Sequence, residues 1–550
     1  MDIKKLYPLI IFISAVVFFI PFLGAVHLFD WDEINFAESA REMIVTSNYS
    51  RVQIDFQPFW EKPPLFFWLQ ALSMHVFGIN EFAARFPNAI TGIITLLTLY
   101  FIGKKLHDEK FGFIWSLSYL GSFLPHLYFK SGIIDPLFNY FIFLTVYFVA
   151  KSCSETNKSK STLLFFYGGI TIGLATLTKG PVGFLIVAIT SVIFWMSCGF
   201  SKITTLKNIL IYLFTFVIVS SLWFGLELTK NGPQFISEFF KYQLALLLTP
   251  VASHGEPFYY HFVVVFLGCF PISILALPAL ANRREMILND SLNFKRWMFI
   301  LFWVVMILFS LVKTKIVHYS SLSYYPLSFL AAVLLYKLLN ATVELKKYLK
   351  VLLIIVGILF SILLIAAPLI AEHKELIIPF IKDKFAVACL STKVQWNGWE
   401  FLIGFLYLIA MLWSIKLLGS KKIMKGIVLL FYSTAFCMFF YLKAVVPKIE
   451  AYSQAPAINF YKSIAGKNVY VSTVGFKSYA HLYYFQKMPD KNLQTSNDDW
   501  LINGTIDKPS YLVAKINTRD FFEHHPDCKL IKQEGGFLFY ERLPAIAPAK

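Results

Sequence analysis

Apolar stretches long enough to cross a lipid bilayer recur along most of this chain and constrain its fold more than any other feature. A membrane-spanning helix needs about 20 consecutive apolar residues, and such runs occur from the N-terminus to about residue 445. Hydrophobic residues make up 57% of the 550 residues and charged residues only 15%, unlike a soluble domain. The sequence therefore predicts a polytopic α-helical membrane protein and excludes disordered, collagen-like and disulfide-stapled chains.

Counting the apolar runs predicts about thirteen transmembrane helices, the first at roughly 6–29. The others are expected at roughly 86–102, 111–129, 133–150, 162–178, 182–199, 208–226, 261–281, 297–312, 320–337, 350–371, 399–418 and 426–443. With this count, the basic residues of alternate loops fall on the side of Lys4 and Lys5, as the positive-inside rule requires. We therefore expect a cytoplasmic N-terminus, and the net charge of +17 needs no nucleic-acid partner.

The same topology divides the chain into two domains. Residues 1–445 form the membrane domain, with long external loops at 30–85 and 227–260, the first carrying amphipathic helices on the membrane surface. Residues 446–550 switch to short alternating runs bounded by turn residues, which predict a small external α/β domain. Cys389 and Cys528 are the cysteines expected outside the membrane, and their spacing neither requires nor excludes a disulfide.

Polar residues at the external ends of the spans are the candidate functional residues, because charge is costly in a membrane chain. They are Asp30, Asp32 and Glu33 after the first span, Glu61 and Lys62 before Pro63-Pro64, then Asp135, Lys179, His254, Lys313, Lys315, His318 and Tyr319. Each has a plain alternative: solvated acids, a surface ion pair, a helix cap or a snorkelling lysine. All of them, however, are expected on one face. Lysines with carboxylates beside apolar helices suit a lipid with a phosphate head, where a carboxylate can act as base or orient an acceptor.

These residues, in this order, resemble the integral-membrane glycosyltransferases of the GT-C fold, which use polyprenyl-phosphate sugars as donors. The match is strongest for Asp32-Glu33 with the helix behind them and for Glu61-Lys62-Pro63-Pro64. The chain is most similar to the bacterial lipid A aminoarabinose transferases and more distantly to protein O-mannosyltransferases. Those transferases tend to carry Arg-Tyr where this chain has Asn35 and Phe36, so the resemblance leaves the sugar and the acceptor open.

The resemblance implies a reaction and a set of roles. A sugar would pass from a polyprenyl-phosphate donor to a lipid, glycan or protein acceptor at the periplasmic face of the bacterial inner membrane. Asp32, Glu33, Glu61 and Asp135 would be catalytic, and Lys62, Lys179, Lys313, Lys315, His318 and Tyr319 would bind the lipid phosphate or donor. No cofactor is required. In relatives, residues matching Glu61 and His254 can hold zinc, although zinc prefers four ligands.

Two other classes of protein remain open from the sequence. A transporter or flippase of a lipid-linked or anionic substrate is also polytopic, but transporters usually show repeated halves and polar groups near the bilayer midplane. An assembly protein that docks through its C-terminal domain would not need the cluster of Asp32, Glu61 and Lys62.

Overall fold

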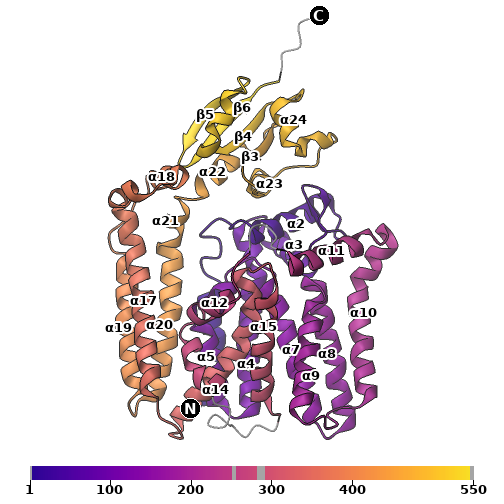
Figure 1. Ribbon diagram of the computed structural model, residues 1–550, viewed down its shortest axis with the longest axis vertical. Coiled ribbons are helices and arrows are strands. Elements are labelled where there is room, and N and C mark those ends of the chain that lie inside the picture. Colours follow the sequence, from indigo (N-terminus) through magenta and orange to yellow (C-terminus); the bar gives the residue numbers. More distant parts are fainter. Residues whose placement is uncertain (1–2, 250–254, 282–291, 545–550) are drawn as a thin grey trace, which may run out of the picture.

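The computed structural model describes residues 3–249, 255–281 and 292–544. Long helices stand side by side and are capped at one end by a small sheet domain (Figure 1). Nine helices within the described ranges are long and apolar enough to cross a membrane. They are α4 (Glu81–Leu106), α7 (Asp135–Ser154), α8 (Lys158–Lys179), α10 (Leu206–Asn231), α15 (Phe294–Leu311), η3 with α16 (Val317–Ser323, Tyr324–Leu339), α17 (Lys347–Glu372), α19 (Phe401–Leu418) and α20 (Ile423–Ala444). The polytopic membrane fold is therefore confirmed, whereas the count of about thirteen spans is not.

Several expected spans are shorter than predicted or broken. The first expected span is α1 (Tyr7–Phe19), which ends before Pro21. The sixth, expected at 182–199, is α9 (Val182–Ser197), which has 16 residues. The run at 111–129 divides into α5 (Glu109–Leu120) and α6 (Phe123–Tyr128), and that at 261–281 into α12 (Tyr260–Gly268), α13 (Ile272–Leu275) and α14 (Leu277–Ala281). Pro271 lies at the break between α12 and α13, where a residue without a backbone N–H cannot continue the helical hydrogen bonds.

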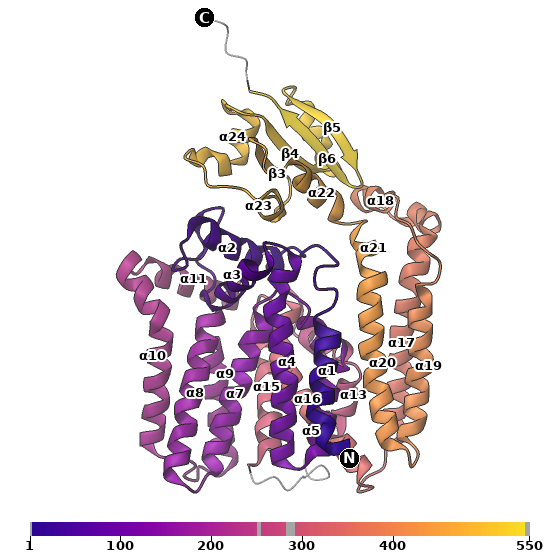
Figure 2. The same cartoon turned by 180° about the vertical axis from the view of Figure 1, so that it is seen from behind.

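The membrane helices form two groups. The larger group contains α4, α5, α7 to α10, α15 and α16, whereas α17, α19 and α20 stand beside it as a separate bundle (Figures 1 and 2). The described N-terminal residues lie at the end of the helices opposite the sheet domain (Figure 1). The chain therefore crosses between the two ends an odd number of times before it enters the sheet domain, in agreement with the predicted parity.

The first loop forms a platform across the end of the larger group. It contains α2 (Asp32–Thr46), a hairpin of β1 (Gln53–Ile54) and β2 (Gln57–Pro58), and α3 (Leu65–Phe77), with α11 (Gln234–Leu248) beside it (Figure 1). The charged side of α2 is buried as well as its apolar side, because Arg41 binds Glu38 at 2.6 Å and donates to the Lys487 carbonyl at 2.7 Å. The helix is thus enclosed between the bundle and the C-terminal domain.

The C-terminal domain is a four-stranded sheet with short helices. The strands β3 (Tyr470–Val474), β4 (Ser510–Lys515), β5 (Cys528–Glu534) and β6 (Phe537–Arg542) have the spatial order β3-β4-β6-β5, with only β3 and β4 parallel. The helices around it and at its base are α18 (Lys384–Leu390), α21 (Val446–Glu450), α22 (Ala455–Ile464), α23 (Ala480–Phe485), α24 (Asp498–Asn503) and α25 (Arg519–Glu523). The predicted small α/β domain is confirmed. Cys389 and Cys528 are both free thiols in the structure.

Candidate active site

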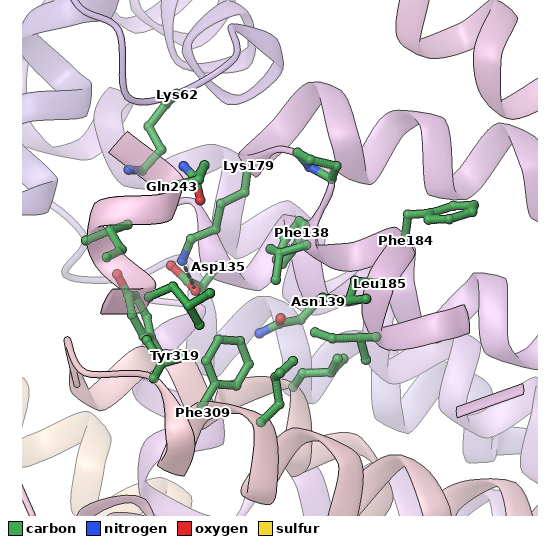
Figure 3. A pocket seen from close by; sticks show the side chains of 18 residues that line it. Lys62, Asp135, Phe138, Asn139, Lys179, Phe184, Leu185, Gln243, Phe309 and Tyr319 are labelled. Carbon is green, nitrogen blue, oxygen red and sulfur yellow. Dashed lines mark hydrogen bonds and ion pairs between the residues drawn. The ribbon is translucent and has the colours of Figure 1, made fainter. Parts of the chain in front are cut away.

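Two neighbouring cavities that share part of their lining lie beneath the platform, between α7, α8, α9, α11 and α15. One is a narrow polar chamber of about 70 Å³, and the other is an apolar arm of about 400 Å³. Both are lined by Lys62, Asp135, Lys179, Leu246 and Tyr319. Charged groups therefore lie at one end of a space whose other end is apolar (Figure 3).

An ion pair between Asp135 and Lys179 forms the base of the chamber. Asp135 begins α7 and Lys179 ends α8, so two separate membrane helices bring the side chains together. Lys179 Nζ donates to Asp135 Oδ1 at 2.6 Å, and Figure 3 shows this bond at the head of the apolar arm. The ammonium group also lies 5.0 Å from the centre of the Tyr319 ring, a cation–π distance.

His318 connects Asp135 to the first loop. Its Nε2 atom lies 3.4 Å from Asp32 Oδ2 and 3.7 Å from Asp135 Oδ2. Asp32 is the first residue of α2, and its side chain is more open than that of Asp135, with exposed fractions of 28% and 5%. Of these two carboxylates, Asp32 is therefore the more accessible from outside the bundle.

Glu61 and Lys62 enter the chamber from the loop before α3. Lys62 Nζ lies 3.7 Å from Glu61 Oε2, too far for a good hydrogen bond, and 5.2 Å from the centre of the Tyr242 ring. Burial lowers the pKa of Lys62, although Glu61 partly opposes the shift. A phosphate oxygen placed here would give this ammonium a shorter, charge-assisted hydrogen bond than its contact with Glu61 and would favour its charged form.

The apolar arm runs between membrane helices. Its walls include Phe138 of α7, Phe184 and Leu185 of α9, and Leu308 and Phe309 of α15 (Figure 3). Among these, Leu185 has 47% of its surface exposed, so the arm is not closed off within the protein. A long hydrocarbon chain suits such a surface, because the arm offers it apolar side chains as the bilayer does.

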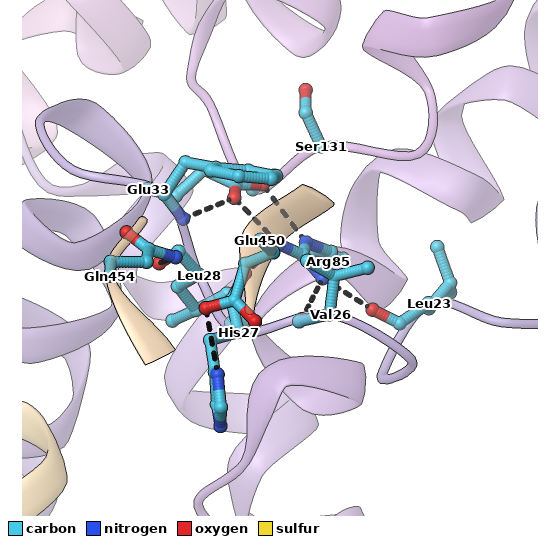
Figure 4. Close-up of polar contacts among 12 residues, drawn as sticks. Leu23, Val26, His27, Leu28, Glu33, Arg85, Ser131, Glu450 and Gln454 are labelled. Atoms are coloured by element: carbon cyan, nitrogen blue, oxygen red, sulfur yellow. Dashed lines mark hydrogen bonds and ion pairs between the residues drawn. The ribbon is translucent and has the colours of Figure 1, made fainter. Parts of the chain in front are cut away.

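Glu33 does not line either cavity. It is buried against Arg85, whose guanidinium donates to both carboxylate oxygens at 3.0 and 2.7 Å and also to the carbonyls of Leu23, Val26 and His27 (Figure 4). Burial opposes ionisation of Glu33, but the ion pair outweighs it and lowers its pKa. Glu33 is thus bound to Arg85 and lies outside the chamber, so the structure does not bring it together with the other residues predicted to be catalytic.

Two other predicted residues, Lys313 and Lys315, also fall outside the cavity linings. Lys313 is exposed, and Lys315 is buried with its ammonium donating to the Val312 carbonyl at 2.9 Å. His254 lies outside the described residues. The predicted zinc pair with Glu61 is thus not described, and the described part of the chain contains no group of three or more His, Cys, Asp or Glu side chains placed to hold a metal.

Sequence reasoning missed several residues of the site. Tyr242 of α11 lines the chamber. Gln243 of α11 and Asn139, one turn after Asp135, line the arm. Burial raises the pKa of Tyr242 far above its usual range, and Glu61 adds to the shift. The signal that could have found Arg85 is a lone arginine at the start of an apolar helix, which rarely lacks a buried partner.

Comparison with known proteins supports this structural picture. The family model described as dolichyl-phosphate-mannose-protein mannosyltransferase matches residues 61–224, which include Lys62, Asp135 and Lys179. A solved structure of ArnT from Cupriavidus metallidurans, bound to undecaprenyl phosphate, superposes over 100% of both chains with a TM-score of 0.78 and 15% sequence identity. The chain has the ArnT fold. The fold part of the predicted resemblance, a GT-C membrane domain with a C-terminal sheet domain, is confirmed.

Similarity in sequence extends to curated relatives. An uncharacterized protein from Aquifex aeolicus is 29% identical over 270 residues, which cover 49% of this chain and 59% of that protein. An undecaprenyl phosphate-alpha-4-amino-4-deoxy-L-arabinose arabinosyl transferase from Wigglesworthia glossinidia brevipalpis is 28% identical over 311 residues, covering 55% and 53%. The chain therefore spans little more than half the length of the curated relatives it matches. The predicted resemblance to polyprenyl-phosphate-sugar transferases is confirmed by similarity, and the reaction itself is treated below.

Proposed function

We propose that this protein is a glycosyltransferase that moves a sugar from a polyprenyl-phosphate donor to an acceptor at the external membrane face. The observation that carries the proposal is that the lysine-lined chamber lies next to an apolar arm between membrane helices and shares Lys62 and Lys179 with it. A polyprenyl phosphate has the same two parts, an anionic head and a long hydrocarbon tail. The named activity of the Wigglesworthia relative, which acts on an undecaprenyl-phosphate sugar, supports the same donor class.

The geometry suggests how the chemistry is divided. Lys62 and Lys179 neutralise the phosphate, which becomes a better leaving group as the bond from the anomeric carbon to the phosphate oxygen breaks. The acceptor oxygen attacks that carbon from the side of Asp32. If the acceptor is a hydroxyl, Asp32 takes its proton, and His318 holds Asp32 in place at 3.4 Å. No step uses a metal or another cofactor.

Orientation and domain roles belong to the same proposal. The N-terminus would be cytoplasmic and the C-terminal domain periplasmic, as the positive-inside pattern indicates. Residues 1–445 would carry the donor and the chemistry, and residues 446–550 would cover the acceptor side. The acceptor is a lipid, glycan or protein.

Turnover in a defined membrane tests the proposal. Purified protein in nanodiscs would be offered a panel of undecaprenyl-phosphate sugars, including 4-amino-4-deoxy-L-arabinose, with membrane extract as acceptor. Release of undecaprenyl phosphate would be followed by mass spectrometry for wild type, Asp32→Asn and the exposed control Asp520→Asn. We expect release from at least one donor, lost only in Asp32→Asn. Binding of the lipid without loss of its sugar would favour a transporter, and no binding at all would refute the proposal.

A further inference from the structure

The C-terminal domain contacts the segment of residues 27–31, here called the strip, which leads directly to Asp32. Ser478 donates a hydrogen bond from Oγ to Asp30 Oδ2, two residues before Asp32. The next residue, Tyr479, packs against Trp31 with ring centres 5.1 Å apart. Trp31 itself lines the polar chamber, so this contact extends from the C-terminal domain to the wall of the candidate active site.

Further hydrogen bonds join the C-terminal domain, and the segment that leads into it, to residues 27 and 28. The Tyr484 hydroxyl accepts from the Leu28 backbone N–H at 2.7 Å, and Gln454 donates to the Leu28 carbonyl at 2.9 Å. Glu450 binds the His27 ring at 3.0 Å (Figure 4). Backbone and side chain are thus both fixed from residue 27 to residue 31, in a segment without regular helix or strand structure over residues 27–29.

The bundle fixes the chain on the other side of Asp32. Glu33 accepts from the Gly132 N–H at 2.5 Å and from Arg85 at 2.7 Å, and both donors belong to the membrane domain. Asp32 therefore lies between an anchor to the C-terminal domain at Asp30 and an anchor to the bundle at Glu33. Among the described residues, the Asp32 carboxylate has one ion-pair contact, to His318 Nε2 at 3.4 Å. The position of Asp32 therefore depends on these two anchors as well as on its contact with His318.

We propose that Ser478 and Tyr479 are positioning residues for Asp32, so that the C-terminal domain completes the active site across the domain boundary. The inference rests on the proposed glycosyl transfer. Reacting groups must be held within a fraction of an ångström, and a displacement of about 1 Å can cost about a hundredfold in rate. Loosening the strip should therefore slow the chemical step while leaving the lysines that hold the lipid phosphate in place.

The chain offers a closely matched control for this test. Ser472 also donates a hydrogen bond from a buried hydroxyl to an aspartate, Asp498, but entirely within the C-terminal domain. Ser472→Ala therefore reports the general cost of losing such a bond. Ser478→Thr keeps the hydroxyl and serves as the rescue variant, and Asp30→Asn weakens the same contact from the loop side without altering the C-terminal domain.

Kinetics in nanodiscs with the active undecaprenyl-phosphate sugar would be combined with hydrogen exchange of the peptide spanning 27–36. For Ser478→Ala and Asp30→Asn we expect kcat to fall about tenfold to a hundredfold, with the Kd for undecaprenyl phosphate unchanged and exchange of the 27–36 peptide faster. Ser478→Thr should restore both values, and Ser472→Ala should change neither. Equal kcat values for Ser478→Ala and Ser472→Ala, or unchanged exchange, would overturn the inference. Failure of wild type to release undecaprenyl phosphate would instead overturn the proposed function.

Discussion

Replacing Lys62 by methionine tests the lipid-phosphate site most simply. Methionine keeps the length and the apolar stem of the side chain but removes its charge. Among the described residues, the ion-pair contact of Lys62 is the long one to Glu61, at 3.7 Å, so the free protein should lose little when the charge is removed. A bound phosphate, in contrast, loses a charge-assisted hydrogen bond worth about 1.5–3 kcal/mol. Every 1.4 kcal/mol is a factor of ten in affinity, so the Kd for undecaprenyl phosphate should rise roughly 10-fold to 140-fold.

The control and the pH dependence make this prediction sharper. Lys241 lies on α11 next to Tyr242, is exposed and pairs with Glu238 on the surface, so Lys241→Met should leave the Kd nearly unchanged. Because burial lowers the pKa of Lys62, wild type should lose affinity as the pH rises, starting below the range where an ordinary lysine loses its proton. Lys62→Arg, which stays charged, should bind without this alkaline loss. Equal Kd values for Lys62→Met and Lys241→Met, measured by native mass spectrometry, would refute the reasoning.

The remaining predictions concern the ion pair between Glu33 and Arg85 and the apolar arm. Glu33→Gln removes the carboxylate that pairs with the buried Arg85 guanidinium and should lower the free energy of unfolding by about 3–5 kcal/mol. In thermal melts, the melting temperature should fall clearly below that of the surface control Glu238→Gln. Equal melting temperatures for the two variants would contradict the anchoring role of Glu33. Leu185→Asn places an amide in the arm and should weaken undecaprenyl phosphate more than the short-chain farnesyl phosphate, whereas Leu163→Asn, equally exposed on α8 but away from the arm, should weaken neither. An equal loss for both lipids in binding titrations would show that the tail does not occupy the arm.

Much of the site can be predicted from the sequence because charge is rare in this chain. Asp32, Glu61, Lys62, Asp135 and Lys179 stand out as polar residues at the ends of apolar runs, and the structure brings all five to one chamber. The parity of the spans, set by loop lysines, already predicts that they share a face. The membrane fold and the C-terminal sheet domain follow from hydropathy and from the change to alternating patterns.

What the sequence does not reveal is set by contacts between distant segments. Glu33 and Asp32 are neighbours with the same chemistry, yet Glu33 is committed to Arg85, 52 residues away, and only the fold distinguishes them. Tyr242 belongs to a loop helix whose position cannot be inferred from spacing. The strand β5, Cys528–Glu534, has a polar sequence and forms at the edge of the sheet by pairing with β6, so no apolar alternation marks it.

The central claim is that the chamber between Lys62 and Lys179 receives a polyprenyl phosphate, with the tail in the apolar arm. The most direct test is an electron cryomicroscopy structure of the protein in nanodiscs with undecaprenyl phosphate. The claim predicts density for the phosphate within hydrogen-bond distance of both ammonium groups, and for the tail beside Phe184, Leu185 and Phe309. A phosphate bound elsewhere, with this chamber and arm filled by neither head nor tail, would contradict it.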